Sequence, residues 1–431
     1  MSYAPMHSNP TLDPQETQSA KYSIIPKKTY RNTLRSRRKK TPSRGTSRKG
    51  LDASFPVIVH CHLCWDWVWQ RPQQFISRLS QRHKVLFVET IAPDPELAAP
   101  MARYRKMEKH PNITRLTLQF PAWRWMDGEY VDSERRRLVQ EFVTGPMAGH
   151  FDHPVQWFYD PMAVPAFAGH MGEILTVYDC MDELSKFKGA PEELVDRELQ
   201  LLERADLVFT GGRKLFEAKS QFHDNCHFYG CGVDGEHFGK ARLAQTAVPD
   251  DLARLPKPVL GFFGVIDERM DYDLVARLAD ANSDWSVAIV GPVTKVDPHS
   301  LPQRANLHWM GQRSYDELPA ICKGFDVCMM PFALNEATEY INPTKALEYM
   351  ATGREIVSTA VPDVVRNFGS VVKIAKDPEE FVLLCQRAIE EPDTAAIGRG
   401  LKMADENSWD SIVNQLENHM AETLKTKRTT D

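Results

Sequence analysis

The chain has 431 residues, of which 42% are hydrophobic, with a formal net charge of −5 and a mean hydropathy of −0.42. This length accommodates two domains of ordinary size with tails, and it excludes a single small module. We expect neither a membrane span nor a signal peptide, because no apolar run is long enough and the first 20 residues lack a charged start and an apolar stretch. The eight cysteines are therefore expected to be reduced thiols in a cytoplasmic protein.

The first 50 residues are strongly basic. They contain 12 lysines and arginines, all between Lys21 and Lys49, and only Asp13 and Glu16 as acids, so their net charge is +10 and that of the remaining chain is −15. Because these residues lack apolar periodicity, residues 1–50 are predicted to be a disordered tail. Such a tail either contacts an anionic surface, as at the inner face of the plasma membrane, or has no fixed partner. The acidic body argues against nucleic acid as the main ligand.

From Phe55 onward, short apolar runs alternate with helical patterns, which is typical of βαβ units and a parallel sheet. Residues 51–235 are predicted to form a first Rossmann-like domain. Its strands are expected at Phe55–Leu63, Lys84–Glu89, Pro154–Asp160, Ile174–Tyr178, Leu207–Thr210 and Cys226–Tyr229. Its helices are expected at Arg71–Arg82, Tyr130–Val143, Glu192–Ala205 and Lys214–Phe222.

Three tryptophans follow the first of these strands, in the run Trp65-Asp66-Trp67-Val68-Trp69-Gln70-Arg71. Aromatic faces match the apolar faces of sugar rings, and polar groups beside them bind hydroxyls. Trp65, Asp66, Trp69 and Arg71 are therefore a candidate sugar-binding surface. The alternative is that the tryptophans pack between a helix and the sheet.

Carboxylates gather after another strand of this domain, in the run Tyr178-Asp179-Cys180-Met181-Asp182-Glu183. Their place at a strand's carboxyl end makes Asp179 and Asp182 candidates for polarising a bound hydroxyl.

Cysteines and histidines give weaker signals. Cys61-His62-Leu63-Cys64 has the spacing of half a zinc site, but no second pair follows at the spacing of a zinc ribbon, so no metal site is predicted. His60 and His62 end the first strand and are weak catalytic candidates. His237 is expected to be a linker residue and not a base.

Residues 236–258 contain Gly, Pro and polar residues without a clear strand, and they are predicted to be a linker and hinge. A second Rossmann-like domain is expected at residues 259–405. Its predicted strands are Val259–Gly264, Trp285–Val290, Leu307–Met310, Val327–Met330, Ile356–Ser358 and Val371–Ile374, and its helices are Tyr272–Ala279, Tyr315–Lys323, Pro343–Thr352 and Pro378–Glu390. A closing helix, Ser408–Lys425, falls in residues 406–431. Two such domains predict a cleft lined by the carboxyl ends of their strands.

The loop after the strand Val259–Gly264 is the first candidate phosphate site. Gly264 allows a ligand to approach the backbone closely, and Arg269 offers a forked donor that suits a phosphate. The alternative for Arg269 is a surface ion pair with Glu268 or Asp271.

The run Asn342-Pro343-Thr344-Lys345 begins the second candidate site. Pro343 suits a first helical turn and Gly353 the position after the last, which makes Asn342 the predicted N-cap. A helix N-terminus with Lys345 in its first turn can hold a phosphate, and Glu348 lies on the same helical face to accept sugar hydroxyls. The alternative is an amphipathic helix with a surface ion pair.

These motifs resemble retaining glycosyltransferases of family 4, within the GT-B superfamily. The resemblance covers the segment from Asn342 to Thr359, the loop after Val259–Gly264, and the runs Asn306–Gly311 and Phe325–Phe332, in the family's order. Asp206–Thr210 and Gly232–Phe238 further resemble bacterial enzymes related to teichuronic acid synthesis.

The resemblance implies a GT-B fold whose last helix crosses back to the first domain, with Glu348 at the nucleotide ribose and Lys345 at the diphosphate. One departure is that the family's first glutamate has no counterpart, since Tyr340 stands near its place with Glu336 and Glu339 nearby. The residue that contacts the donor sugar is therefore unassigned.

The implied function is transfer of a hexosyl group, with retention, from a nucleotide-diphosphate donor to a glycan or lipid-linked acceptor in cell-surface polysaccharide synthesis. No metal or other cofactor is implied, since cations and a helix N-terminus would stabilise the departing diphosphate. Two alternatives are a nucleotide-sugar epimerase of the same fold and a non-catalytic scaffold of polysaccharide assembly. The candidate catalytic residues are Asp179, Asp182, Arg269 and Lys345; the donor site comprises Gly264, Arg269, Asn342, Pro343, Thr344, Lys345 and Glu348; and the acceptor site comprises Trp65, Asp66, Trp69 and Arg71.

Overall fold

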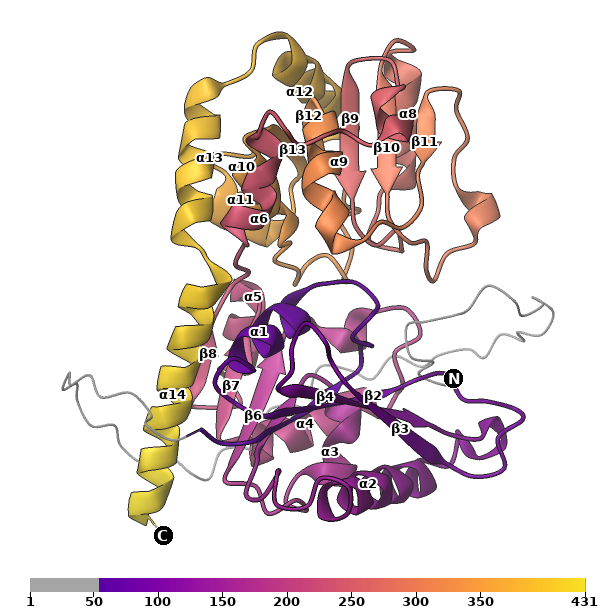
Figure 1. Ribbon diagram of the computed structural model, residues 1–431. Coiled ribbons are helices and arrows are strands. Elements are labelled where there is room, and N and C mark those ends of the chain that lie inside the picture. The colour runs from indigo at the N-terminus through magenta and orange to yellow at the C-terminus, as the bar shows by residue number, and fades with distance from the viewer. Residues whose placement is uncertain (1–53, 431) are drawn as a thin grey trace.

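The computed structural model describes residues 54–430, and the basic segment 1–50 lies outside them. Two α/β domains lie one above the other in Figure 1, with the C-terminal helix along the side of the lower, N-terminal one. The predicted fold class, two domains built on parallel sheets, is confirmed.

The N-terminal domain is built on an eight-stranded sheet of order β3-β4-β2-β1-β5-β6-β7-β8, parallel except for β3. Five helices accompany it. The strands are β1 Val57–Cys61, β2 Val85–Thr90, β3 Met101–Lys106, β4 Ile113–Gln119, β5 Val155–Phe158, β6 Leu175–Cys180, β7 Leu207–Thr210 and β8 Cys226–Phe228, and the helices are α1 Arg71–Leu79, α2 Gly128–Thr144, α3 Val164–Phe167, α4 Leu194–Arg204 and α5 Arg213–Lys219.

The β3–β4 hairpin is absent from the predicted strands. β3 lies at the sheet edge, and its sequence Met-Ala-Arg-Tyr-Arg-Lys leaves its last four side chains exposed, so it has no apolar run. β4 alternates buried and half-buried residues because it is covered on one face more than on the other.

Both faces of this sheet are buried, which accounts for its nearly continuous apolar strands. On β1, Val57 and Val59 face a cluster that includes α1 residue Phe75, whereas Ile58 faces a second cluster that includes α2 residue Val139.

The C-terminal domain has a six-stranded parallel sheet of order β11-β10-β9-β12-β13-β14. Its strands are β9 Val259–Phe263, β10 Ser286–Val290, β11 Leu307–Trp309, β12 Val327–Met330, β13 Glu355–Thr359 and β14 Lys373–Ala375, and its helices are α8 Tyr272–Ala281, α9 Leu318–Gly324, α10 Lys345–Thr352, α11 Pro362–Phe368, α12 Pro378–Glu390 and α13 Thr394–Glu406. The helices α11 and α13 are additional to the predicted ones.

The segment predicted as a linker, residues 236–258, is packed and helical in part. It contains most of α6 Gly235–Gly239 and all of α7 Asp250–Ala253. Phe238, Ala241 and Leu252 are buried in the hydrophobic cluster of the C-terminal domain. Burial of these side chains attaches the segment to the C-terminal domain.

The closing helix α14, Trp409–Thr430, leaves the C-terminal domain and packs on the N-terminal one (Figure 1). Trp409, Val413 and Leu416 are buried in the cluster that also contains Phe75 of α1. Where it crosses, Ser408 pairs with Val233, so the two crossing segments lie side by side. The predicted return of the last helix is therefore observed. Within residues 54–430, no helix combines the length and apolarity that crossing a membrane requires.

Candidate functional site

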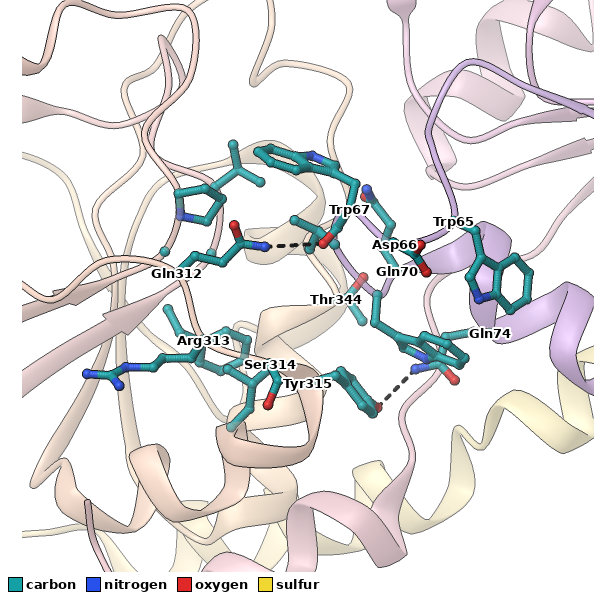
Figure 2. Close-up of a pocket in the computed structure, with 18 of the residues that line it drawn as sticks. Trp65, Asp66, Trp67, Gln70, Gln74, Gln312, Arg313, Ser314, Tyr315 and Thr344 are labelled. Atoms are coloured by element: carbon teal, nitrogen blue, oxygen red, sulfur yellow. Dashed lines mark hydrogen bonds between the residues drawn. The ribbon is translucent and has the colours of Figure 1, made fainter. Parts of the chain in front are cut away.

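A cavity of about 860 Å³ lies between the two domains. The N-terminal domain lines it with residues 65–70 and 105–110 and with Gln74. The C-terminal domain contributes residues 263–265, 290–292, 312–315, 344 and 345, together with Arg269, Leu318 and Glu348. Figure 2 shows Trp65, Asp66, Gln70 and Gln74 on one side facing Gln312–Tyr315 on the other.

Two hydrogen bonds cross this cavity (Figure 2). Gln74 Nε2 donates to the Tyr315 hydroxyl at 2.9 Å, and Gln312 Nε2 donates to the Trp67 carbonyl at 3.3 Å. Because each bond joins one domain to the other, the domains are in contact across this cavity.

Two glycines at strand ends shape the floor of the cavity. Gly264 follows β9 with φ of +146°, and a Cβ there would overlap the side chain of Lys345. Gly291 follows β10 with φ of +152°, and a Cβ there would overlap the carbonyl oxygen of Gly264. Both positions therefore require glycine. Sequence reasoning identified Gly264 and missed Gly291, although a glycine directly after a buried strand is the same signal.

Lys345 and Glu348 both reach the cavity from α10. Burial lowers the pKa of Lys345, and neighbouring Arg269 lowers it further, while Glu348 opposes both effects. Lys345 Nζ lies 5.6 Å from the ring centroid of Phe262 and 5.9 Å from that of Phe263, and within residues 54–430 it forms no ion pair. A cation held over aromatic rings without a paired carboxylate is ready to receive an anionic ligand.

Glu348 is 7% exposed, and burial raises its pKa to about 7, although Lys345 lowers it. The carboxyl group is therefore close to half-ionised at neutral pH, and it can accept hydrogen bonds from hydroxyl groups of a ligand.

Arg269 lines the same cavity. Asp267 binds its Nε at 2.9 Å and its Nη2 at 2.7 Å, which is a different partner from the Glu268 or Asp271 that the sequence suggested. Among the described residues Nη1 has no hydrogen-bond partner, so it is the donor that a ligand can use. Burial lowers the pKa of Arg269, but Asp267 more than offsets this effect.

The start of α10 differs from the prediction. The helix begins at Lys345, with Thr344 before it, so Asn342 is not its N-cap. Asn342 Nδ2 instead donates to the Gly211 carbonyl of the N-terminal domain at 3.2 Å, and Pro343 is buried. Of these three residues only Thr344 lines the cavity. Asn342 therefore joins the domains, because its amide satisfies a backbone acceptor of the N-terminal domain.

The tryptophan run divides between core and cavity. Trp65 is 5% exposed and packs edge-on against Phe87 at 5.1 Å, as the packing alternative required, although it also touches the cavity. Trp69 is half-buried and lies between His110 at 5.9 Å and Tyr315 at 5.8 Å. These three rings form an aromatic wall.

Asp66 is exposed at the cavity, but its carboxylate is occupied. Its Oδ2 accepts hydrogen bonds from Arg105 Nη2 at 2.7 Å and from Arg115 Nη1. Asp66 thus orders two arginines of the β3–β4 hairpin, a role that the sequence could not indicate without that hairpin.

Arg71 and Asp179 do not line the cavity; they form a buried ion pair. Arg71 Nη2 lies 2.9 Å from Asp179 Oδ1, and the two side chains are 4% and 0% exposed. Arg71 Nη1 also donates to the Tyr229 carbonyl at 2.8 Å. Each group thus neutralises the other inside the domain, and the roles of Arg71 in acceptor binding and of Asp179 in polarising a hydroxyl stay predictions.

Asp182 is half-buried near Arg269. Burial raises its pKa to about 6, while Arg269 and Arg71 lower it. Asp182 does not line the main cavity, but its charge acts on Arg269, which does. Of the two predicted catalytic carboxylates, Asp182 is the one that is not held in the ion pair with Arg71.

The histidines and cysteines singled out from the sequence are packed side chains. Burial lowers the pKa of His60 to about 3 and also lowers that of His62. His237 stacks on Tyr315 at 4.4 Å and bonds its carbonyl. Cys61 and Cys64 are buried thiols, and no cluster of metal-ligating residues occurs between residues 54 and 430.

Sequence reasoning missed two segments of the site, residues 105–110 and 312–315. The first belongs to the unpredicted hairpin. The second begins the predicted helix: Ser314 and Glu317 cap a short 3-10 helix, Tyr315–Glu317, which leads into α9 and presents Tyr315 to the cavity.

Comparisons with known proteins agree with this architecture. Residues 257–391 match the family described as Glycosyl transferases group 1. The chain is 23% identical over 315 residues to TuaH of Bacillus subtilis (strain 168), whose name assigns it to teichuronic acid biosynthesis as a glycosyltransferase; the match covers 67% of this chain and 78% of that protein.

Solved structures share the fold at low sequence identity. An E. coli trehalose-6-phosphate structure bound with UDP-2-fluoro glucose matches with a TM-score of 0.61 at 14% identity, covering 86% of this chain and 99% of that one. Sucrose-phosphate synthase from Thermosynechococcus elongatus matches with a TM-score of 0.61 at 15% identity, covering 87% and 100%. The chain therefore shares the two-domain GT-B fold of these structures, and its residues 257–391 match the family of Glycosyl transferases group 1.

Proposed function

We propose that this protein transfers a hexosyl group from a nucleoside-diphosphate sugar to a hydroxyl of a glycan or lipid-linked acceptor. The observation that carries the proposal is the meeting of Lys345, Arg269 and Gly264 in one cavity between the domains, with Glu348 one helical turn away. The side chains of Lys345 and Arg269, beside the glycine backbone at Gly264, can bind a diphosphate. The carboxylate of Glu348 can accept hydrogen bonds from hydroxyl groups.

The donor is proposed to lie along the C-terminal wall of the cavity. Its diphosphate would contact Lys345 Nζ and Arg269 Nη1, and its ribose hydroxyls would donate to Glu348. A second cavity of about 470 Å³ lies beside Gly291 and is lined by apolar residues that include Ile266, Trp309 and Leu301. This cavity suits the flat face of a nucleobase.

In the reaction, the bond between the sugar's anomeric carbon and the diphosphate oxygen breaks, and the acceptor oxygen forms a new bond to that carbon. The leaving diphosphate gains negative charge, so fixed cations that contact it stabilise the transition state more than the ground state. Lys345 and Arg269 supply these cations. The proton of the acceptor hydroxyl passes to the leaving diphosphate oxygen. The role of Asp182 in polarising that hydroxyl stays a prediction, because Asp182 lies outside the cavity lining and its charge acts on Arg269.

Retention of configuration and a role in cell-surface polysaccharide synthesis are finer parts of the proposal. The former is supported by a trehalose-6-phosphate synthase structure whose description concerns glycosyltransfer with retention, which matches with a TM-score of 0.57 at 14% identity. The latter is supported by the similarity to TuaH.

Peripheral membrane contact through the basic segment 1–50 is proposed on its charge of +10. Cosedimentation with anionic vesicles should depend on this segment. Equal cosedimentation of the full chain and a chain without residues 1–50 would contradict the contact.

The donor site is tested by calorimetry with UDP, GDP, ADP and dTDP. We expect one of them to bind and raise the melting temperature. Lys345→Ala should weaken that binding about 10- to 100-fold, because a hydrogen bond to a charged group contributes about 1.5–3 kcal/mol.

Lys402→Ala is the matched control, since Lys402 is 79% exposed on α13 and lies outside the cavity. Binding of none of the four nucleotides would refute the proposed donor site. Unchanged binding by Lys345→Ala would remove Lys345 from it.

A further inference from the structure

The β3–β4 hairpin carries an excess of positive charge at one end of the cavity. Residues 101–110 contain Arg103, Arg105, Lys106 and Lys109 but only Glu108 as an acid, in a chain whose residues after position 50 have a net charge of −15. The residues from Arg105 to His110 line the cavity. The hairpin is therefore positively charged at the cavity, whereas the chain after position 50 is negatively charged as a whole.

Part of this charge is neutralised within the hairpin's surroundings. The carboxylates of Asp66 and Glu89 bind Arg105 and Arg115, so the two negative charges neutralise the two positive ones. The pairing also fixes Arg105 in place, because Asp66 joins it to the partly buried Arg115.

The two hairpin lysines are not neutralised in the same way. Lys109 pairs with Asp316 of the other domain at 3.3 Å, but the two side chains are 83% and 75% exposed, so water screens this pair. Lys106 is exposed at the cavity and has no ion pair among the described residues. A ligand with a negative group would therefore meet an uncompensated cation here.

The aromatic wall lies in the same cavity as the hairpin and the donor cations. Trp69, His110 and Tyr315 form this wall, and His110 is itself at the hairpin tip. A sugar ring stacked on the wall would have one side toward Lys345 and another toward the hairpin. The cavity thus provides two positive regions, one on each domain, and the proposed donor diphosphate would occupy only the one that contains Lys345.

We propose that the acceptor is an anionic saccharide whose carboxylate or phosphate group is bound by Lys106, with Lys109 and Arg105 beside it. This inference rests on the proposed function and names the class of its acceptor. Uronates carry a carboxylate on the sugar ring and sugar phosphates carry a phosphate. Either negative group can bind the ammonium group of Lys106.

The test compares three probes on the full chain saturated with the nucleotide that binds best: methyl glucoside, methyl glucuronide and glucose 1-phosphate. Saturation with nucleotide keeps the anionic probes out of the Lys345 region. We expect at least one anionic probe to bind about tenfold tighter than methyl glucoside, and this preference to weaken with added salt. Tighter binding of the glucuronide identifies a uronate, and tighter binding of the sugar phosphate identifies a phosphate.

Variants of Lys106 assign the preference to the hairpin. Lys106→Glu should abolish it, Lys106→Arg should retain it, and Lys402→Glu, outside the cavity, should leave it unchanged. Equal binding of the neutral and anionic probes to the original chain, or an undiminished preference in Lys106→Glu, would overturn the inference. Nucleotide binding by Lys106→Glu should match that of the original chain, so failure of the donor site is distinguishable from failure of the acceptor assignment.

Discussion

Glu348 should make the protein less stable as the pH rises, and Glu348→Gln should remove this effect. The carboxyl is 7% exposed and its pKa rises from 4.5 to about 7, with burial as the main cause and Lys345 opposing it. Between these two pH values the folded chain holds a proton that the unfolded chain has lost. The free energy of unfolding therefore falls across this interval, and the full cost of ionising the buried group is present above about pH 7.

The size of this effect follows from the two pKa values. Each pKa unit corresponds to about 1.4 kcal/mol, so the cost at pH 8 is on the order of 3 kcal/mol. Glutamine has nearly the shape of a protonated glutamic acid and cannot ionise. We expect Glu348→Gln to be more stable than the original chain by about this amount at pH 8, and by less than about 1 kcal/mol at pH 5.

Urea denaturation at pH 5 and pH 8 measures this difference, with Glu406→Gln as the control because Glu406 is 63% exposed. The same variant should bind the nucleoside diphosphate about tenfold more weakly, since an amide is a poorer acceptor for ribose hydroxyls than a carboxylate. An identical pH dependence of stability in Glu348→Gln and the original chain would refute the argument that burial governs this group.

Two further predictions concern the residues around the site. Arg71→Ala should destabilise the protein by about 3–5 kcal/mol in urea denaturation, because it leaves the buried carboxylate of Asp179 without a cation; a loss below about 1 kcal/mol would contradict the ion-pair assignment. Gly264→Ala should weaken nucleotide binding at least about tenfold in calorimetry, because its Cβ overlaps Lys345 and its φ of +146° strains any other residue. Unchanged binding by Gly264→Ala would show that the loop can rearrange without moving Lys345.

The strands could be predicted wherever a strand is buried on both faces, since β1, β7, β9 and β12 are short continuous apolar runs. The β3–β4 hairpin could not, because an edge strand with four exposed side chains lacks such a run. The segment 236–258 was predicted as a linker for a related reason. Its buried residues are isolated, and their packing partners lie far along the chain.

For the site, local motifs indicated the residues that a single loop or helix presents, namely Gly264, Arg269, Lys345 and Glu348, and the structure brings these four together. Pairings between distant segments were not accessible. Arg71 and Asp179 are 108 residues apart, so each was interpreted alone as a ligand-binding group although they neutralise one another. Their roles in catalysis and binding remain predictions for the experiments above.

The return of α14 to the N-terminal domain has a consequence for how the chain folds as it is synthesised. Trp409, Val413, Leu416, Met420 and Leu424 complete a hydrophobic cluster whose other members begin at Phe55. The N-terminal domain therefore cannot bury this face of its sheet until residues 409–424, which follow the whole C-terminal domain, have been made. During that interval a large apolar surface is open to water, so the N-terminal domain is completed after the C-terminal one.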